Sequence, residues 1–165
     1  MMIGNRLPRA EVIAERRSLT KETLDLMTKF INKDRNNPGL CRIARRITQG
    51  AKGPEDEAAR VHHWVRTWIK YKPDPPGAEL VQDAEAVLQN RIGDCDDMAT
   101  LAGALLRCLG HQIEPLAVWW KVPQRSRFTH AVVKDHTAGR IVDPVSPDFN
   151  TWPPRGREVY ATMGP

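Results

Sequence analysis

The sequence has few cysteines, few aromatic residues and no long apolar run. Its 165 residues include 3 cysteines, and only 6% of the residues are aromatic. No window approaches the roughly 18 to 20 apolar residues that a membrane span needs, and residues 1–6 lack the apolar region of a secretory signal. These absences exclude an integral membrane protein, and we expect a cytoplasmic location.

The cysteine count also limits the chemistry. Cys41, Cys95 and Cys108 are too few, and odd in number, for a disulfide framework, and no Cys-x-x-Cys pair offers a zinc site. We therefore expect a reducing compartment, no metal site and no bound cofactor. In such a chain one cysteine can be a nucleophile.

The net charge of +5 is unevenly distributed. Residues 1–50 hold 11 Lys and Arg against 5 Asp and Glu, whereas residues 51–165 hold 14 against 15. A basic patch of this kind suits nucleic acid, an acidic protein surface or simple solvation. We favour a solubilising helical face, because no aromatic residues for base stacking interleave the charges. The patch would comprise Arg6, Arg9, Arg16, Arg17, Arg42, Arg45 and Arg46.

Periodicity divides the chain into helices followed by strands. Apolar residues at three- and four-residue steps are typical of helices, and after Gly110 the pattern changes to period two with β-branched and aromatic residues. This order predicts an α+β fold with an antiparallel sheet. The predicted helices cover residues 9–33 (as one or two helices), 40–48, 54–71, 83–90 and 94–109, and the predicted strands cover 115–120, 129–134, 140–142 and 158–162. In helix 54–71 we expect a core-facing stripe of Val61, Trp64, Val65, Trp68 and Ile69.

Cys95 lies at the start of the most regular predicted helix. The helix dipole there favours a thiolate, which is the reactive form of cysteine. The neighbouring Asp94, Asp96 and Asp97 oppose a thiolate, so a cationic histidine would have to outweigh them.

Of the five histidines, only His130 lies inside a predicted strand. If the turn at residues 135–139 is centred near 136–137, the cross-strand partner of His130 is residue 143 or 144, which brings Asp143 beside it. A carboxylate in that position orients an imidazole and stabilises its charged form. The adjacent His62 and His63 are assigned to the surface, and Asp135 and His136 to the turn.

These motifs, in this order, resemble the transglutaminase-like superfamily of cysteine enzymes. The resemblance rests on Gly93-Asp94-Cys95-Asp96-Asp97 and the helix after it, on Phe128-Thr129-His130-Ala131-Val132-Val133 and on Val142-Asp143-Pro144. It covers about residues 55–147. The chain is most similar to the small members of bacteria and Mu-like tailed phages.

The resemblance implies a papain-like α+β core with the Cys95 helix packed on the sheet. Cys95 would be the nucleophile, His130 the general base and then acid, and Asp143 the orienting residue, with acyl transfer through a thioester. The substrate would be a protein or peptide. The oxyanion would be held by backbone N–H groups at the helix start and by Gln89 or Asn90. Asp94, Trp119 and Trp120 are candidates for the substrate cleft, where one tryptophan packs inward and the other lines the cleft.

We interpret residues 1–54 as a basic helical segment and residues 55–165 as the catalytic core. Hydrolysis of peptide or amide bonds is favoured over amine cross-linking. Two alternatives remain open: a phage virion or assembly protein of the tail or head-tail region that retains the fold, and nucleic-acid binding through the basic N-terminus. A phage-encoded protein would lie in the host cytoplasm or the virion, with phage structural proteins as partners.

Overall fold

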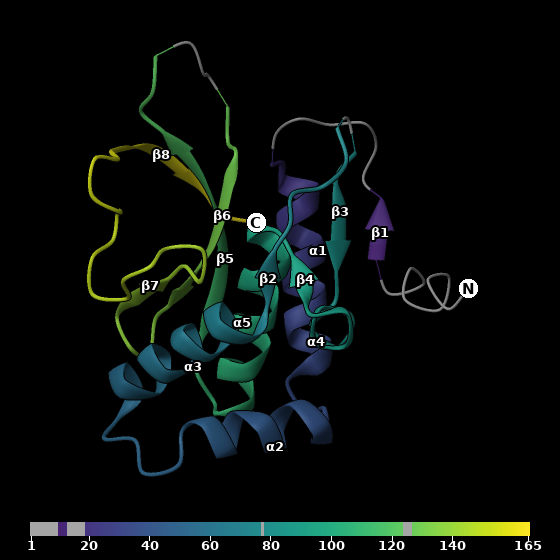
Figure 1. The fold of residues 1–165 in the computed structure, drawn as a ribbon, viewed down its shortest axis with the longest axis vertical. Helices are drawn as coiled ribbons and strands as arrows, with labels where there is room; N and C mark the ends of the chain where they lie inside the picture. Colours follow the sequence, from purple (N-terminus) through teal and green to yellow (C-terminus); the bar gives the residue numbers. More distant parts are fainter. Residues whose placement is uncertain (1–9, 13–18, 77, 124–126) are drawn as a thin grey trace.

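A computed structural model of the chain describes residues 10–12, 19–76, 78–123 and 127–165. In chain order these residues form β1 (Ala10–Val12), α1 (Lys21–Asp34), α2 (Pro38–Ile47), α3 (Pro54–Trp68), β2 (Lys70–Tyr71), β3 (Leu80–Gln82), α4 (Ala84–Asn90), β4 (Ile92–Gly93), α5 (Cys95–Cys108), β5 (Ile113–Trp120), β6 (His130–Asp135), β7 (Arg140–Val142) and β8 (Val159–Met163). The α+β architecture is as predicted (Figure 1). Among these residues no helix is long and apolar enough to cross a bilayer.

The prediction for the N-terminal third needs one correction. Residues 10–12 form a strand rather than part of a helix, and they pair antiparallel with β3. Residues 13–18 of the predicted helix lie outside the described residues, as do Arg6, Arg9, Arg16 and Arg17 of the proposed basic patch. The remaining three arginines of that patch, Arg42, Arg45 and Arg46, are exposed on α2.

Helix α5 forms the centre of the molecule, between the other helices and the main sheet (Figure 1). Its side chains are buried without interruption from Asp96 to Leu106. Helices α1 and α2 bury their apolar faces in the same core as α5, so the N-terminal helices have no separate core. Gly103 permits close packing of α1 on α5, because a Cβ there would lie 2.8 Å from the Cδ1 of Ile31.

Cys41 and Cys108 form a disulfide that joins α2 to the end of α5. The cysteine count predicts no disulfide framework, but helix packing brings together two cysteines 67 positions apart, with Cα atoms 5.0 Å from each other. Cys95 is the one free cysteine of the chain. Disulfides persist mainly in oxidising surroundings, so the bond does not support the predicted cytoplasmic location.

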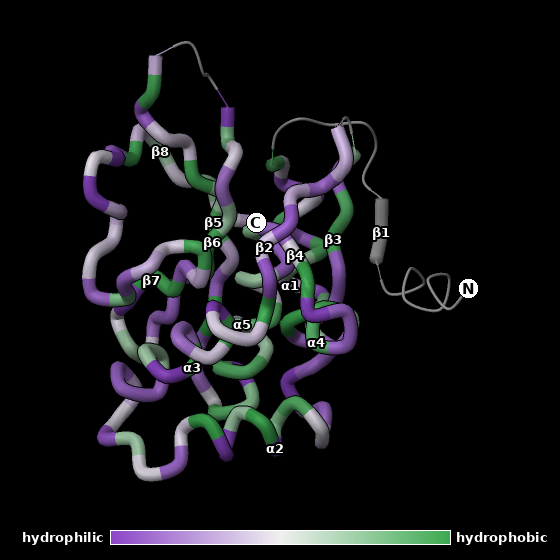
Figure 2. The backbone as a smooth tube through the Cα atoms, viewed as in Figure 1, coloured by the Kyte–Doolittle hydropathy of each residue, from purple (hydrophilic) through white to green (hydrophobic). Residues whose placement is uncertain are grey.

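The main sheet has the strand order β7-β6-β5-β8. One face of the sheet packs on α5 through small and branched residues, and the other face forms a second apolar cluster around Trp120. Figure 2 shows apolar residues along α5 and the inner strands. Val133 pairs with Val142, so the register differs by one to two residues from the prediction, and Asp143 lies diagonally from His130 rather than directly opposite.

Candidate active site

Cys95 is the first residue of α5, and short backbone pairings position it. Strand β2 runs parallel to β4, with Tyr71 opposite Gly93, immediately before the helix. Glycine is required at 93 because a Cβ would lie 2.6 Å from the Cβ of Asp97. The Asp97 carboxylate accepts a hydrogen bond from the backbone N–H of Asp94 at 3.3 Å, which stabilises the helix start.

The Cys95 thiol is half-buried beside strand β6, next to the backbone N–H of Ala131. Burial raises its pKa well above the usual value, and the negative charge of Asp94 adds to the rise. The hydrogen bond from Ala131 opposes this rise in pKa. The resting thiol is therefore protonated, and a neighbouring base has to remove its proton before or during attack.

His130, the residue before Ala131, is the base in position. Its Nε2 donates a hydrogen bond of 2.7 Å to Oδ2 of Asp143, which is 3% exposed. With the proton of the neutral imidazole on Nε2, the lone pair is on Nδ1. Among the described residues Nδ1 has no hydrogen-bond partner, so this atom is available to accept a proton.

Helix α3 holds the segment that carries Asp143. His62 Nε2 donates to the carbonyl oxygens of Asp143 and Ser146, each at 3.0 Å, and Arg66 donates to the carbonyl oxygen of Val145 at 2.7 Å. The surface assignment of His62 was wrong, because this histidine is only 3% exposed, whereas His63 is exposed. Burial lowers the pKa of His62, so it serves as a neutral donor.

The two tryptophans point in opposite directions, as expected for neighbours on a strand. Trp120 stacks on the His130 ring with centroids 5.3 Å apart and lines the cavity that contains His130. Trp119 packs against Phe128 and Tyr160 instead.

The two oxyanion candidates lie on α4. The Asn90 amide donates to Oε1 of Gln82 at 2.7 Å, and Gln89 is exposed. Neither residue lines the cavity that holds His130 and Asp143. Sequence patterns missed Tyr71, which does line this cavity; burial, followed by the charge of Cys95, raises the pKa of its hydroxyl. Tyr71 is brought to the site by its strand pairing with Gly93. Sequence periodicity does not detect this pairing, because the strand has only two residues.

A cluster of carboxyl groups surrounds the start of α5. Asp94 is joined there by Asp96 and Asp97 from the helix, and by Asp74 and Glu79 from the segment between β2 and β3. Burial, followed by the charge of Asp94, raises the pKa of Asp74 to about 6 and that of Glu79 to about 7. The same causes raise the pKa values of Asp96 and Asp97 well above the ordinary range.

These groups are also the residues that can hold a cation. The ligand atoms of Asp94, Cys95 and Asp96 lie within 4.8 Å of one another, and so do those of Asp74, Asp94 and Asp97. The prediction of no metal site considered only the acids on one turn, whereas the fold adds Asp74 from a separate segment. Asp97 is already occupied, because both of its oxygens accept hydrogen bonds from Gln82.

The cavity at the candidate site has a volume of about 350 Å³. His130 and Asp143 line it together with Trp120, Tyr71 and Arg157. A neutral thiol, an imidazole with one free nitrogen and a buried carboxylate beside a cavity are the groups required for acyl transfer through a thioester.

Comparison with known proteins agrees with this arrangement. The profile of the transglutaminase-like superfamily matches residues 42–134, more than half of the chain. The chain belongs to the transglutaminase-like superfamily. The matched region contains Cys95 and His130 and ends before Asp143. No curated protein matches the sequence.

Two solved structures share the fold of this superfamily member. One is a proposed cysteine protease from Cytophaga hutchinsonii, with a TM-score of 0.59 and 19% identity over 93% of this chain and 54% of that one. The other is a proposed protease from Parabacteroides distasonis, with a TM-score of 0.56 and 17% identity over 74% of this chain and 26% of that one. The chain therefore spans about half of one relative and a quarter of the other.

Proposed function

We propose that the protein is a cysteine hydrolase that cleaves peptide or amide bonds through a thioester on Cys95. The observation that carries the proposal is the His130–Asp143 hydrogen bond of 2.7 Å at the edge of a cavity, with the Cys95 thiol beside the next residue, Ala131. Membership of the superfamily and the two similar structures support it.

The reaction follows from the arrangement of these groups. Nδ1 of His130 takes the thiol proton as the sulfur of Cys95 attacks the substrate carbonyl carbon, and the carbonyl oxygen becomes negatively charged. The backbone N–H of Cys95, in the first turn of α5, would donate to that oxygen, because the first N–H groups of a helix have no partner within the helix. The tetrahedral species then collapses, the carbon–nitrogen bond breaks, and His130 gives its proton to the leaving amine.

Water completes the cycle in the proposed hydrolase. His130 accepts a proton from water as the oxygen attacks the thioester carbonyl, and the carbon–sulfur bond breaks to release the carboxylic acid and the thiol. Asp143 stabilises the imidazolium that forms in each half of the cycle. An amine in place of water would give cross-linking.

The products distinguish these outcomes. The purified protein is incubated with denatured casein and with the proteins encoded beside it, and intact masses are compared between wild type and Cys95→Ala. We expect fragments with the wild type alone. Cross-linked products that have lost ammonia would establish amine transfer instead, and identical masses in both reactions would count against an enzyme.

A non-catalytic role in an assembly is the second candidate. The specific observation in its favour is the raised pKa of Cys95, which burial and Asp94 produce and which disfavours a reactive thiol. In that case Cys95→Ala would leave the biological role of the protein intact, whereas a hydrolase would lose it. A genetic complementation assay with Cys95→Ala separates the two.

A further inference from the structure

Two more cavities continue from the one that contains His130. A cavity of about 470 Å³ shares Tyr71 and Val145 with it, and a cavity of about 340 Å³ shares Trp68 and Ile69 with the second. Because neighbouring cavities share lining residues, the three lie next to one another, from the candidate site along the end of α3. We call the second and third cavities the side groove.

The charged side chains that line these three cavities are mainly cationic. Arg66 and Lys70 line the middle cavity, Arg91 lines the far one and Arg157 lines the cavity at the site. Among the described residues that line the three cavities, the one carboxylate is Asp143, which is paired with His130. Residues 51–165 carry 14 basic and 15 acidic residues, so composition alone does not explain four cations here.

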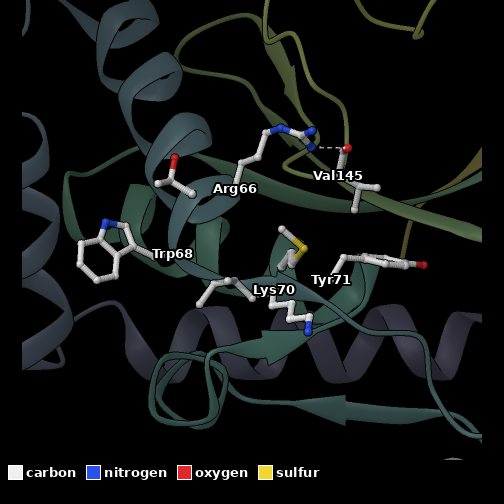
Figure 3. A pocket seen from close by; sticks show the side chains of 8 residues that line it. Arg66, Trp68, Lys70, Tyr71 and Val145 are labelled. Carbon is white, nitrogen blue, oxygen red and sulfur yellow. Dashed lines mark hydrogen bonds between the residues drawn. The ribbon is translucent and has the colours of Figure 1, made fainter.

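These cations are not neutralised within the described part of the protein. Lys70 is exposed, and its ammonium group has no hydrogen bond or ion pair there. Arg66 bonds to backbone carbonyl oxygens, as Figure 3 shows for Val145. Arg91 and Arg157 lie over the rings of Trp68 and Trp120 at 5.2 and 5.3 Å, contacts that leave their charge available to an anion.

Large aromatic side chains that line the middle cavity are exposed to solvent. Trp68 is 48% exposed and Tyr71 is 50% exposed, and both line it (Figure 3). The prediction that Trp68 faces the core was wrong, because the residue lies at the last position of α3, where the helix leaves the core. Exposed aromatic rings among cations are typical of a binding surface rather than of a solvated face.

We propose that the side groove binds an acidic segment of the peptide substrate, with carboxylates at Lys70 and Arg66 and an apolar side chain against Trp68 and Tyr71. The inference rests on the proposed function and adds the class of substrate. Since the side groove adjoins the cavity that His130 and Asp143 line, the bound segment and the scissile bond would belong to one extended chain. A peptide fits this arrangement better than a nucleic acid, because the groups at Cys95 act on a carbonyl carbon.

Peptide electrophiles test the proposal without a known substrate. Two synthetic peptides of equal length carry a chloroacetamide at one end and one Phe, and they differ only in having Glu or Lys at the remaining positions. Alkylation of Cys95 is followed by mass spectrometry, and each rate is divided by the rate with free chloroacetamide. We expect the Glu peptide to react about tenfold faster than the Lys peptide at low salt, with a smaller ratio at high salt.

Charge-reversal variants test whether the side groove causes the preference for the Glu peptide. Lys70→Glu is expected to reduce the preference for the Glu peptide about tenfold, because one attraction becomes a repulsion. The matched control is Arg46→Glu, which makes the same charge change on the exposed face of α2 and should leave the preference unchanged. Equal rates for both peptides, or equal effects of the two reversals, would overturn the proposal.

Two further measurements distinguish a failure of the side-groove proposal from a failure of the proposed function. Free chloroacetamide reports thiol reactivity alone, and binding of a fluorescent Glu peptide to Cys95→Ala, measured by anisotropy, reports the groove alone. Binding that Lys70→Glu weakens would sustain the groove even if Cys95 were inert. A single-stranded oligonucleotide that displaces the Glu peptide at equal concentration would contradict a peptide site.

Discussion

The protein contains two histidine–aspartate pairs with nearly the same hydrogen bond but different surroundings. His130 bonds to Asp143 at 2.7 Å, and His111 bonds to Asp135 at 2.6 Å. Both aspartates are almost fully buried. A short bond to a buried carboxylate therefore does not by itself mark a catalytic histidine.

The second ring nitrogen distinguishes the pairs. Nε2 of His111 bonds to Glu57 at 2.8 Å, so both nitrogens are occupied, and the residue is only 2% exposed. His130 instead has one bonded nitrogen among the described residues, lines a cavity and precedes Ala131, whose backbone N–H bonds the free thiol of Cys95. We interpret His111 as a structural link that joins α3, the end of α5 and β6, and His130 as the proton carrier.

The largest expected difference is in catalysis. His130→Ala should lower peptide hydrolysis by about 10³-fold or more, because the thiol and the leaving amine lose their proton carrier. His111→Ala, assayed at a temperature where it is folded, should retain activity near the wild-type level. Steady-state rates with a peptide cleaved by the wild type make the comparison. Equal losses in the two variants would remove the distinction between the pairs.

Substitutions of the two aspartates should differ in the same way in their effects on activity and stability. Asp143→Asn should lower hydrolysis by about 10² to 10⁴-fold with little loss of stability, because the amide no longer stabilises the imidazolium. Asp135→Asn should instead cost about 3 kcal/mol of unfolding free energy, because it breaks a buried charge pair. Rates and urea unfolding curves are measured on both variants. A stability loss confined to Asp143→Asn would contradict the assignment of Asp143 to catalysis and Asp135 to stability.

A smaller effect is expected from the segment that positions Asp143. His62→Gln removes the ring that bonds the carbonyl oxygens of Asp143 and Ser146, and we expect about a tenfold lower kcat through misplacement of Asp143. The exposed neighbour His63→Gln serves as the matched control, with no change in kcat expected. If KM rather than kcat changes in His62→Gln, the residue acts on substrate binding instead.

The smallest effect is on the pH dependence of stability. Burial opposes the charge of His111, but the hydrogen bonds that its ring donates to Asp135 and Glu57 outweigh burial and raise its pKa above 6.5. Its contribution is therefore fully present below about pH 6.5 and is lost as the pH rises through the folded pKa. The raised pKa values of Asp74 (about 6) and Glu79 (about 7) act in the same direction at lower pH.

The lowered pKa of His62 acts in the opposite direction below about pH 6.5, but the raised pKa values of the carboxyl groups around α5 and of His111 outnumber it. Unfolding free energies from urea titrations between about pH 5 and about pH 8 should thus fall with rising pH, since the folded state binds more protons. His111→Asn should flatten the curve above about pH 6.5, and Asp74→Asn with Glu79→Gln should flatten it below about pH 7. Stability that rises over this range in the wild type would contradict these pKa directions.

Local patterns in the sequence predicted much of the fold. Helix α5 and the strands of the main sheet follow from periodicity, because each buries one face over several residues. Strand β1 was assigned to a helix, since its pairing with β3 is tertiary and three residues show no period. The disulfide of Cys41 with Cys108 likewise depends on how α2 packs against α5.

For the candidate site, the order of the Cys, His and Asp motifs along the chain was more informative than the exact spacing between them. The pairing of His130 with Asp143 was predicted, although the register was not, because long side chains bridge a diagonal offset. His62 and Tyr71 were missed. Each acts through partners distant in sequence, the backbone of residues 143–146 for one and the Cys95 segment for the other.

We propose that His130, and not His111, activates Cys95. The rate of Cys95 labelling by iodoacetamide at neutral pH, followed by peptide mass mapping under non-reducing conditions, tests this role. We expect labelling at Cys95 alone, about tenfold or more slower in His130→Ala and unchanged in His111→Ala. An unchanged rate in His130→Ala would contradict it.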